Sequence, residues 1–181
     1  MKDRKSGISA IAFSAVTAAA YAVLTIIFAP ISYGAVQFRI SEALCILPFF
    51  LPNTAWGLFV GCAAANIMTG NVFDILFGSV ATLLAGLSTA GFGKLGRSTA
   101  LKAAGCACPV VFNAFIIGAV ITKAYSGLDI LTHQGVFWLN VLQIAAGEAA
   151  VMYIIGLPLM IYLPKRPFFT ELLSKAEYRR K

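Results

Sequence analysis

The sequence predicts an all-α integral membrane protein, built as a bundle of six transmembrane helices with both termini in the cytoplasm. Two features of its composition point there: about 60% of the 181 residues are apolar, and only 12% are charged. An ordinary soluble domain carries roughly 25% charged residues, so this chain has too few polar side chains to cover a soluble surface. The third observation is that long apolar runs alternate with short charged segments, as in membrane proteins.

Six apolar runs are the candidate membrane spans, because a hydrocarbon core about 30 Å thick needs about 20 helical residues. The first run, 8–29, follows a basic segment and is about twice as long as the apolar part of a cleavable signal peptide. We therefore expect it to be the first span. The later runs cover 38–51, 54–70, 73–93, 104–124 and 136–163. Residues 1–181 are expected to form one membrane domain, with a basic cytoplasmic tail over 164–181.

The basic residues predict the orientation of these spans. Six spans place both termini on one side of the membrane, and 12 of the 14 lysines and arginines then fall on that side. Arg39 and Lys123 are the two that fall on the other side. Short loops rich in Lys and Arg face the cytoplasm, so the sequence predicts cytoplasmic termini.

Several classes of protein and of site are excluded. The net charge of +7 does not indicate nucleic-acid binding, because the basic residues cluster in short segments between long apolar runs, and we expect none of these segments to be interleaved with exposed aromatics. Cys106 and Cys108 have the spacing C-x-C, and the single histidine, His133, is expected in a solvated loop, so we expect no metal site. The sequence has no Walker A loop and no H-E-x-x-H or G-x-S-x-G motif. An enzyme is therefore not expected.

Charged residues inside the predicted spans are the first candidates for a site. Glu42, Asp74 and Glu148 lie in or at spans, in the outer half or near the midplane. A charge near the bilayer centre costs at least ~2.5–3.5 kcal/mol on insertion scales, so such residues face the protein interior and often mark a functional site.

The densest polar segment is Gln37-Phe38-Arg39-Ile40-Ser41-Glu42, at the start of the second span. Arg39 and Glu42 are three residues apart and share a helix face. They could form an ion pair that caps the helix. They could instead form a rim that contacts a ligand, with Glu42 accepting hydrogen bonds and Arg39 orienting it. Both can hold together, because a neighbouring arginine keeps a buried carboxylate ionised.

The sixth span carries a second polar group. Asn140, Gln143 and Gly147 fall within about 60° of one another on a helix, and Glu148 lies about 80° from Asn140. Glu148 is expected near mid-bilayer, either in an interhelical hydrogen bond or as a ligand contact at the floor of a pocket.

Three further polar residues and one small-residue stripe leave alternatives open. Asn66, Asp74 and Asn113 could contact a ligand or could only join and cap helices. The first span contains two small-x-x-x-small pairs, which allow close helix approach in lipid. These pairs serve either packing inside the bundle or docking of another membrane protein; they are Ala15/Ala19 and Ala18/Ala22.

A family resemblance follows from the run Tyr33-Gly34-x-x-Gln37-Phe38-Arg39-x-Ser41-Glu42-Ala43-Leu44, with Leu47-Pro48 after it. This run resembles the queuosine-precursor transporter (QueT) family. The later segments Gly61…Asn66, Asp74-x-x-x-Gly78-Ser79, Asn113 and Gly147-Glu148…Gly156-x-Pro158 look like the later family blocks in the same order. The resemblance covers nearly the whole chain, and Q-F-R-x-S-E is its most specific part.

The resemblance implies a substrate-binding S component of an energy-coupling factor (ECF) transporter in the plasma membrane of a prokaryote. Such a subunit captures a micronutrient at its outer face and works with a transmembrane T component and two cytoplasmic ATPases. ATP is then used by the partners, and no cofactor is implied for this chain. An A-x-x-x-A surface on the first helix docks the T component, and either alanine pair fits it.

The implied substrates are 7-deazaguanine bases such as preQ1, preQ0 or queuine. Their N1–H and exocyclic amine are adjacent donors that suit one carboxylate, either Glu42 or Glu148. Asp74 is a candidate for the cation of an aminomethyl group. The remaining candidates are Gln37, Asn66, Asn113 and Asn140 for the O6 edge, and Phe38 and Trp138 for stacking on the ring.

Three other functions stay open at this point. One is an S component for a different vitamin, with the same architecture. Another is a non-catalytic membrane scaffold, which would bind no small molecule. The third, a membrane enzyme acting on lipids, would need a metal or an acid–base pair on the cytoplasmic side, and the cytoplasmic loops show none. The preferred deazaguanine is not decided by the sequence.

Overall fold

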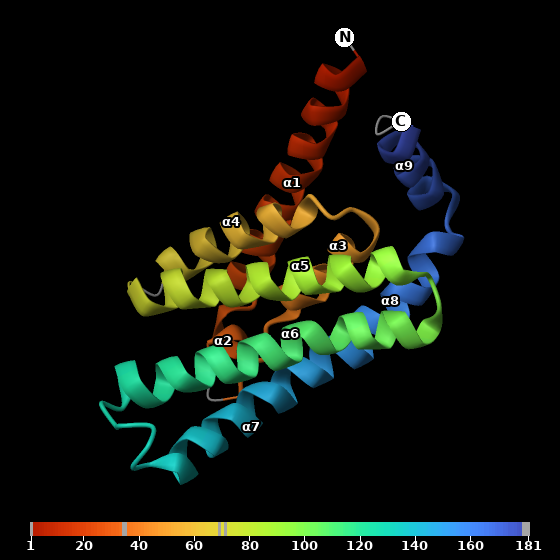
Figure 1. Ribbon diagram of the computed structural model, residues 1–181. Helices are drawn as coiled ribbons and strands as arrows, with labels where there is room; N and C mark the ends of the chain where they lie inside the picture. The colour runs from red at the N-terminus through yellow and green to blue at the C-terminus, as the bar shows by residue number, and fades with distance from the viewer. Residues whose placement is uncertain (1, 34–35, 69, 71, 179–181) are drawn as a thin grey trace.

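The computed structural model describes residues 2–33, 36–68, 70 and 72–178, which form helices and no β-strand (Figure 1). The helices are joined by short loops, and several continue directly into the next. In chain order they are α1 Lys2–Ile27, α2 Ala29–Ser32, η1 Ile40–Ile46, α3 Leu47–Phe50, α4 Thr54–Ile67, η2 Asp74–Gly78, α5 Ser79–Leu95, α6 Thr99–Val120, η3 Ile121–Tyr125, α7 Gln134–Ala150, η4 Val151–Gly156, α8 Leu157–Tyr162, η5 Leu163–Lys165 and α9 Pro167–Tyr178.

Four helical segments are long and apolar enough to cross a membrane: Ile8–Ile27, Asp74–Leu95, Thr99–Tyr125 and Gln134–Lys165. The prediction of a helical membrane protein is confirmed at this level. The second and third predicted spans correspond to two shorter apolar helices, Ile40–Phe50 and Thr54–Ile67. The six-span count and the orientation of the termini stay predictions.

The second predicted span is not one regular α-helix. Residues Ile40–Ile46 form the 3-10 helix η1, which continues into the single α-helical turn α3 with Pro48 in its first positions. Pro48 has no backbone N–H and so donates no hydrogen bond at the junction of η1 and α3. The 3-10 segment matters for the site, because residues three apart lie on the same face of such a helix.

Helix α1 crosses α4 at very close range, and Figure 1 shows it running obliquely to α5, α6 and α7. Two glycines of α4 allow this approach. A Cβ on Gly57 would come within 2.2 Å of the Ser14 carbonyl oxygen, and one on Gly61 within 2.6 Å of the Ala18 oxygen. The face of α1 that carries Ser14 and Ala18 is therefore covered by α4. The same face carries Tyr21 into the interior.

Helices α5, α6 and α7 lie side by side, and α5 also packs against α4 (Figure 1). Three π-helical segments interrupt this layer: η2 before α5, η3 after α6 and η4 after α7. Short π-helical segments are frequent at functional sites, because the extra residue re-aims neighbouring side chains. Segment η4 packs against η1, which places the first half of the second predicted span against the interior of the last one.

The predicted tail after Pro164 is partly an ordered helix. Helix α9 packs Phe169 edge-on against Phe50, with ring centroids 5.4 Å apart, and also contacts α1. Phe169 is buried, whereas its neighbour Phe168 is 76% exposed. This amphipathic pattern makes α9 a helix that folds back on the bundle. Residues Arg179, Arg180 and Lys181 of the tail lie outside the described residues.

Candidate functional site

Buried polar side chains gather inside the bundle, where segments far apart in the sequence meet. Each is at most 7% exposed, although several carry charge or strong hydrogen-bonding groups. Polar groups withdrawn from water need partners, so their contacts define what the site can hold. We call this group the buried polar cluster: Tyr21 and Thr25 of α1, Arg39, Ser41, Glu42 and Cys45 in or just before η1, Cys62 and Asn66 of α4, Thr82 of α5, Asn113 of α6 and Glu148 of α7.

Glu42 has protein partners on both carboxylate oxygens. The Tyr21 hydroxyl donates to Oε1, the Cys45 thiol donates to Oε2 over 3.0 Å, and the Thr82 hydroxyl lies 3.4 Å from Oε1. The 3-10 form of η1 brings Cys45 back onto Glu42, because the two residues are three apart. Glu42 is therefore anchored to α1, η1 and α5, and its acceptor capacity is largely used within the protein.

Arg39 lies near Glu42 but forms no ion pair with it. An ion pair within 4.0 Å joins Lys123 and Asp129 at the protein surface, but none joins Arg39 and Glu42. The Arg39 guanidinium instead lies 3.8 Å from the Cys62 sulfur and 5.5 Å from the centre of the Tyr33 ring. Its Nε atom is buried and has no hydrogen-bond partner among the described residues. The capping ion pair considered above is therefore not formed.

Glu148 is the second buried carboxylate, and it is only half paired. The side-chain amide of Asn113 donates to Glu148 Oε1 over 2.8 Å. The other oxygen, Oε2, is buried and has no partner among the described residues. Glu148 lies close enough to Arg39 and Glu42 to interact with both charges. The cluster thus contains an unused carboxylate oxygen and an unused guanidinium N–H in one region.

The first interhelical loop closes over this region. Its Gln37 carbonyl oxygen lies against α7 at Gly147, where a Cβ would come within 2.6 Å of it. The Tyr33 hydroxyl donates to the Ala65 carbonyl over 2.9 Å, and Phe38 N–H donates to the Ile31 carbonyl over 3.0 Å. Burial raises the pKa of Tyr33, so its hydroxyl keeps the proton that it donates. We call Tyr33 and residues 36–39 the covering segment; Gly34 lies outside the described residues.

Several predicted site residues lie at one edge of the cluster. Asn66 donates to the Asp74 backbone carbonyl over 2.8 Å and contacts Cys62. The Asp74 carboxylate accepts a hydrogen bond from the Tyr125 hydroxyl. Asn140 donates to the Thr122 hydroxyl over 3.0 Å and so joins α7 to η3. Asn66 is part of the cluster, whereas Asp74 and Asn140 are half-buried around it.

The two predicted stacking aromatics are less enclosed. Phe38 is 42% exposed and Trp138 is 49% exposed. Trp138 packs edge-on against Phe115, with ring centroids 5.9 Å apart, on the outer surface of α6 and α7. Gln37 is half-buried in the covering segment. The structure therefore brings Arg39, Glu42, Asn66, Asn113 and Glu148 together and leaves both aromatics at the surface.

Comparison with known proteins decides the family. The family model described as QueT transporter matches residues 11–165. The chain belongs to the QueT transporter family. A curated relative, the queuosine precursor transporter QueT of Lactococcus lactis subsp. cremoris (strain MG1363), is 35% identical over 72 residues. That match covers 39% of this chain and 43% of the relative, so it spans less than half of either protein. No solved structure matches the chain.

Membership of the QueT family makes this chain a transporter-family membrane protein with several apolar membrane-spanning helices. The described residues hold no group of three or more His, Cys, Asp or Glu side chains that could bind a metal ion. The cluster offers a carboxylate, a guanidinium and amides in a water-poor interior, which is the composition of a site that orients a polar ligand.

Five members of the cluster in this QueT-family chain were not singled out from the sequence. They are Tyr21, Thr25, Cys45, Cys62 and Thr82. Four of them, Tyr21, Cys45, Cys62 and Thr82, surround Glu42 or Arg39. Their separation from Glu42 reaches 40 residues, so periodicity could not connect them. One signal was available: a tyrosine in the middle of an apolar span needs a partner for its hydroxyl.

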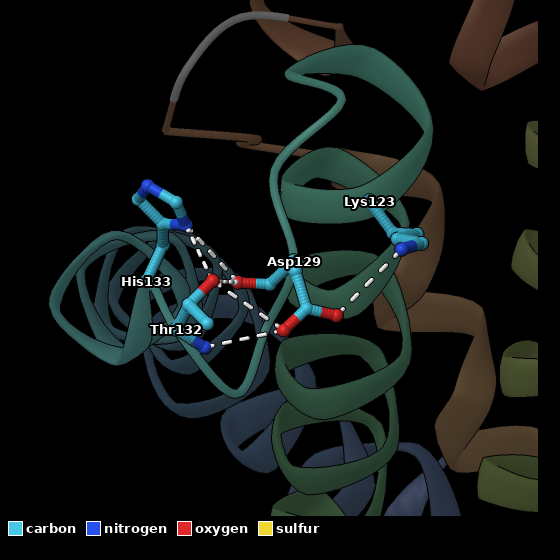
Figure 2. A network of polar contacts seen from close by, with 4 residues as sticks. All are labelled: Lys123, Asp129, Thr132 and His133. Atoms are coloured by element: carbon cyan, nitrogen blue, oxygen red, sulfur yellow. Dashed lines mark hydrogen bonds and ion pairs between the residues drawn. The ribbon is translucent and has the colours of Figure 1, made fainter.

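A separate surface network lies in the loop between η3 and α7 (Figure 2). Lys123 Nζ lies 3.7 Å from Asp129 Oδ1, and the Thr132 N–H donates to Asp129 Oδ2 over 3.2 Å. His133 is exposed and its Nδ1 lies 2.9 Å from the Thr132 hydroxyl. These bonds hold the loop together and do not involve the buried polar cluster.

Proposed function

We propose that this chain is the substrate-capture subunit, or S component, of an ECF-type importer and binds a 7-deazaguanine precursor of queuosine. Membership of the QueT transporter family supports the substrate class, and so does the name of the L. lactis relative. The single observation that carries the assignment is the pair of unused buried groups, Glu148 Oε2 and Arg39 Nε. A protein interior rarely leaves such groups unpaired unless a ligand or water completes them.

The chemistry of a 7-deazaguanine complements these two groups. Its N1–H and exocyclic amine are adjacent donors that match one carboxylate, and O6 accepts from a guanidinium or an amide. Glu42 is the poorer acceptor, because Tyr21 and Cys45 already donate to it. We therefore assign the donor edge of the base to Glu148, with Arg39 and Asn113 beside it. Two carboxylates beside one guanidinium also favour a ligand rich in donors or carrying a cation.

Binding at this site requires the covering segment to open, because Arg39 and Glu148 are almost fully buried. The remaining predicted contacts lie in or around the covering segment and the edge of the buried polar cluster. They are Gln37, Phe38, Asn66, Asp74, Trp138 and Asn140. In the proposed topology six spans place both termini in the cytoplasm, and the covering segment faces outward. The exposed aromatics Phe38 and Trp138 are then available to the base as the segment closes on it.

The proposed partners are a T component and two ATPases, which would supply the energy of transport. Ala18 contacts α4 inside the bundle, whereas Ala15 and Ala19 are exposed. Ala22 is half-buried. We therefore assign partner docking to Ala15 and Ala19, since a surface already covered within the bundle is unavailable to another helix.

The proposed substrate is tested by titrating the purified chain in detergent with preQ1, preQ0 and queuine, and with riboflavin, thiamine and biotin. Wild type and Glu148→Gln are compared with Asp129→Asn, a carboxylate-to-amide change in the exposed loop of Figure 2. Stranding one buried hydrogen-bonding partner costs about 2 kcal/mol, or roughly 30-fold in affinity. Thermal unfolding of each variant shows that it is folded.

We expect at least one deazaguanine to bind, Glu148→Gln to weaken it about 30-fold, and Asp129→Asn to leave it unchanged. Binding of riboflavin, thiamine or biotin in place of every deazaguanine would keep the architecture and overturn the substrate. No binding by a folded wild-type chain would contradict the capture role and favour a scaffold.

A further inference from the structure

A second site is formed at the end of the molecule where α9 packs, distant from the buried polar cluster. Helix α9, η5, the turn between α5 and α6, the first turn of α6, and α3 line an open cavity of about 310 Å³. None of its lining residues, all of which are described, belongs to the buried polar cluster or carries a carboxylate. The cavity is lined by two cations, two hydroxyls and two apolar walls, which are Arg97 and Lys102, Thr170 and Ser174, and Phe50 and Leu173.

The Arg97 guanidinium is held in place before any ligand arrives. Its Nη1 donates to the Phe49 carbonyl over 2.9 Å. Its central carbon lies 5.4 Å from the centre of the Phe49 ring and 5.2 Å from that of Phe50. These contacts use one of five N–H donors, so the others remain available to an anion. A preorganised guanidinium loses little side-chain freedom on binding a phosphate.

Lys102 adds a second positive charge that the protein does not neutralise. Its ammonium group has no hydrogen bond or ion pair with any described residue, and it is repelled by the charges of Arg97 and Lys165. Three cations therefore converge on one small region. An anion between Arg97 and Lys102 would relieve this repulsion, which makes the charge of the cavity complementary to a phosphate.

The rest of the lining distinguishes a lipid from a free anion. The hydroxyls of Thr170 and Ser174 donate to backbone carbonyls of α9 itself, over 2.8 Å in each case, so their oxygens remain as acceptors. A headgroup with hydroxyls of its own would satisfy them. Phe50 and Leu173 offer an apolar wall, and the exposed Phe168 lies on the same amphipathic helix. Amphipathic helices of this kind lie at the level of lipid headgroups.

The geometry points to a binding site for an anionic phospholipid with a hydroxylated headgroup, such as phosphatidylglycerol, between α9 and the α5–α6 turn. The phosphate lies between Arg97 and Lys102, the headgroup hydroxyls face Thr170 and Ser174, and the acyl chains extend along the apolar wall into the bilayer. The lipid belongs to the leaflet on the side of the termini, and it ties α9 to the bundle. This site is independent of the proposed substrate.

The test measures lipid binding by the full chain. Short-chain phosphatidylglycerol is titrated against the detergent-solubilised protein, with short-chain phosphatidylcholine as the zwitterionic reference. Lys102→Gln is compared with Lys123→Gln, which removes the same charge in η3, directly after the opposite end of α6. Inorganic phosphate is added in a separate arm. Removing one lysine from a headgroup site weakens anionic-lipid binding about five-fold, from a contribution of about 1 kcal/mol per basic residue.

We expect phosphatidylglycerol to bind more tightly than phosphatidylcholine, Lys102→Gln to weaken it about five-fold, and Lys123→Gln to have no effect. Arg97→Gln should weaken it further, with thermal unfolding showing that the variant is folded. Equal binding of the two lipids, or equal loss in the Lys102 and Lys123 variants, would overturn the site. Full displacement of the lipid by millimolar inorganic phosphate would also overturn it, since the cavity would then be a free-anion site.

Discussion

The backbone oxygen of Gln37 lies against Gly147, so close that a Cβ on Gly147 would come within 2.6 Å of it. This contact joins the covering segment to α7 one residue before Glu148. Because only glycine allows the approach, closure of the segment and the position of the unused Glu148 oxygen are linked. The proposed capture of a ligand therefore depends on this backbone contact between Gln37 and Gly147, in which no charged group takes part.

Gly147→Ala tests this relationship. The added methyl group cannot fit beneath Gln37, so the covering segment is held partly open and the bound ligand is less enclosed. Overpacking of this kind costs about 1–3 kcal/mol, and we expect deazaguanine affinity to fall roughly 10- to 100-fold. Gly135→Ala in the same helix is the matched control, because a Cβ there meets nothing within 4 Å. Equal affinity in the two variants would show that closure does not depend on this contact.

Tyr21→Phe tests whether Glu42 has a structural role. The change removes the hydroxyl that donates to Glu42 Oε1 and leaves a buried carboxylate short of a partner. We expect the free energy of unfolding to fall by about 1–3 kcal/mol, measured as a lower thermal midpoint in detergent. Tyr153→Phe serves as the control, since its hydroxyl bonds the Ala103 carbonyl from an exposed position. A Tyr21→Phe variant as stable as the control would argue against this anchor.

Ala19→Leu and Ala18→Leu separate docking from packing. The first enlarges the exposed side of α1, so we expect an unchanged thermal midpoint and reduced co-purification with a T component. The second forces a larger side chain toward Gly61 on α4, where the backbone atoms of Ala18 are already in close contact. It should lower the thermal midpoint, because overpacking costs about 1–3 kcal/mol. Normal assembly of Ala19→Leu would place the partner elsewhere.

The apolar runs of the sequence were sufficient to predict the helices, because lipid requires every backbone group to be paired within its own helix. The same rule could not reveal the irregular parts. Segment 38–51 was expected to be one short span and is a 3-10 helix joined to α3. Its polar side chains point inward, and that tertiary requirement is not visible in a hydropathy pattern. Helix α9 was expected only as a basic tail, although the pairing of exposed Phe168 with buried Phe169 indicates amphipathicity.

The candidate site was predicted in part. Arg39, Glu42 and Glu148 were singled out because charge is costly in a membrane, and all three are buried together. The sequence could not choose between the two carboxylates. That choice depends on which oxygens Tyr21, Cys45 and Asn113 already occupy, and these contacts join different helices.

The central claim is that Glu148 recognises the donor edge of the ligand, and a thermodynamic cycle tests it most directly. Binding of a 7-deazaguanine and of its analogue without the exocyclic amine is measured for wild type and for Glu148→Gln. A cycle isolates the contact between the two deleted groups. We predict that wild type prefers the amine by roughly 30-fold, as expected for a buried charge-assisted hydrogen bond, and that the variant prefers it by less than about threefold. The same preference in both proteins would contradict the assignment of Glu148.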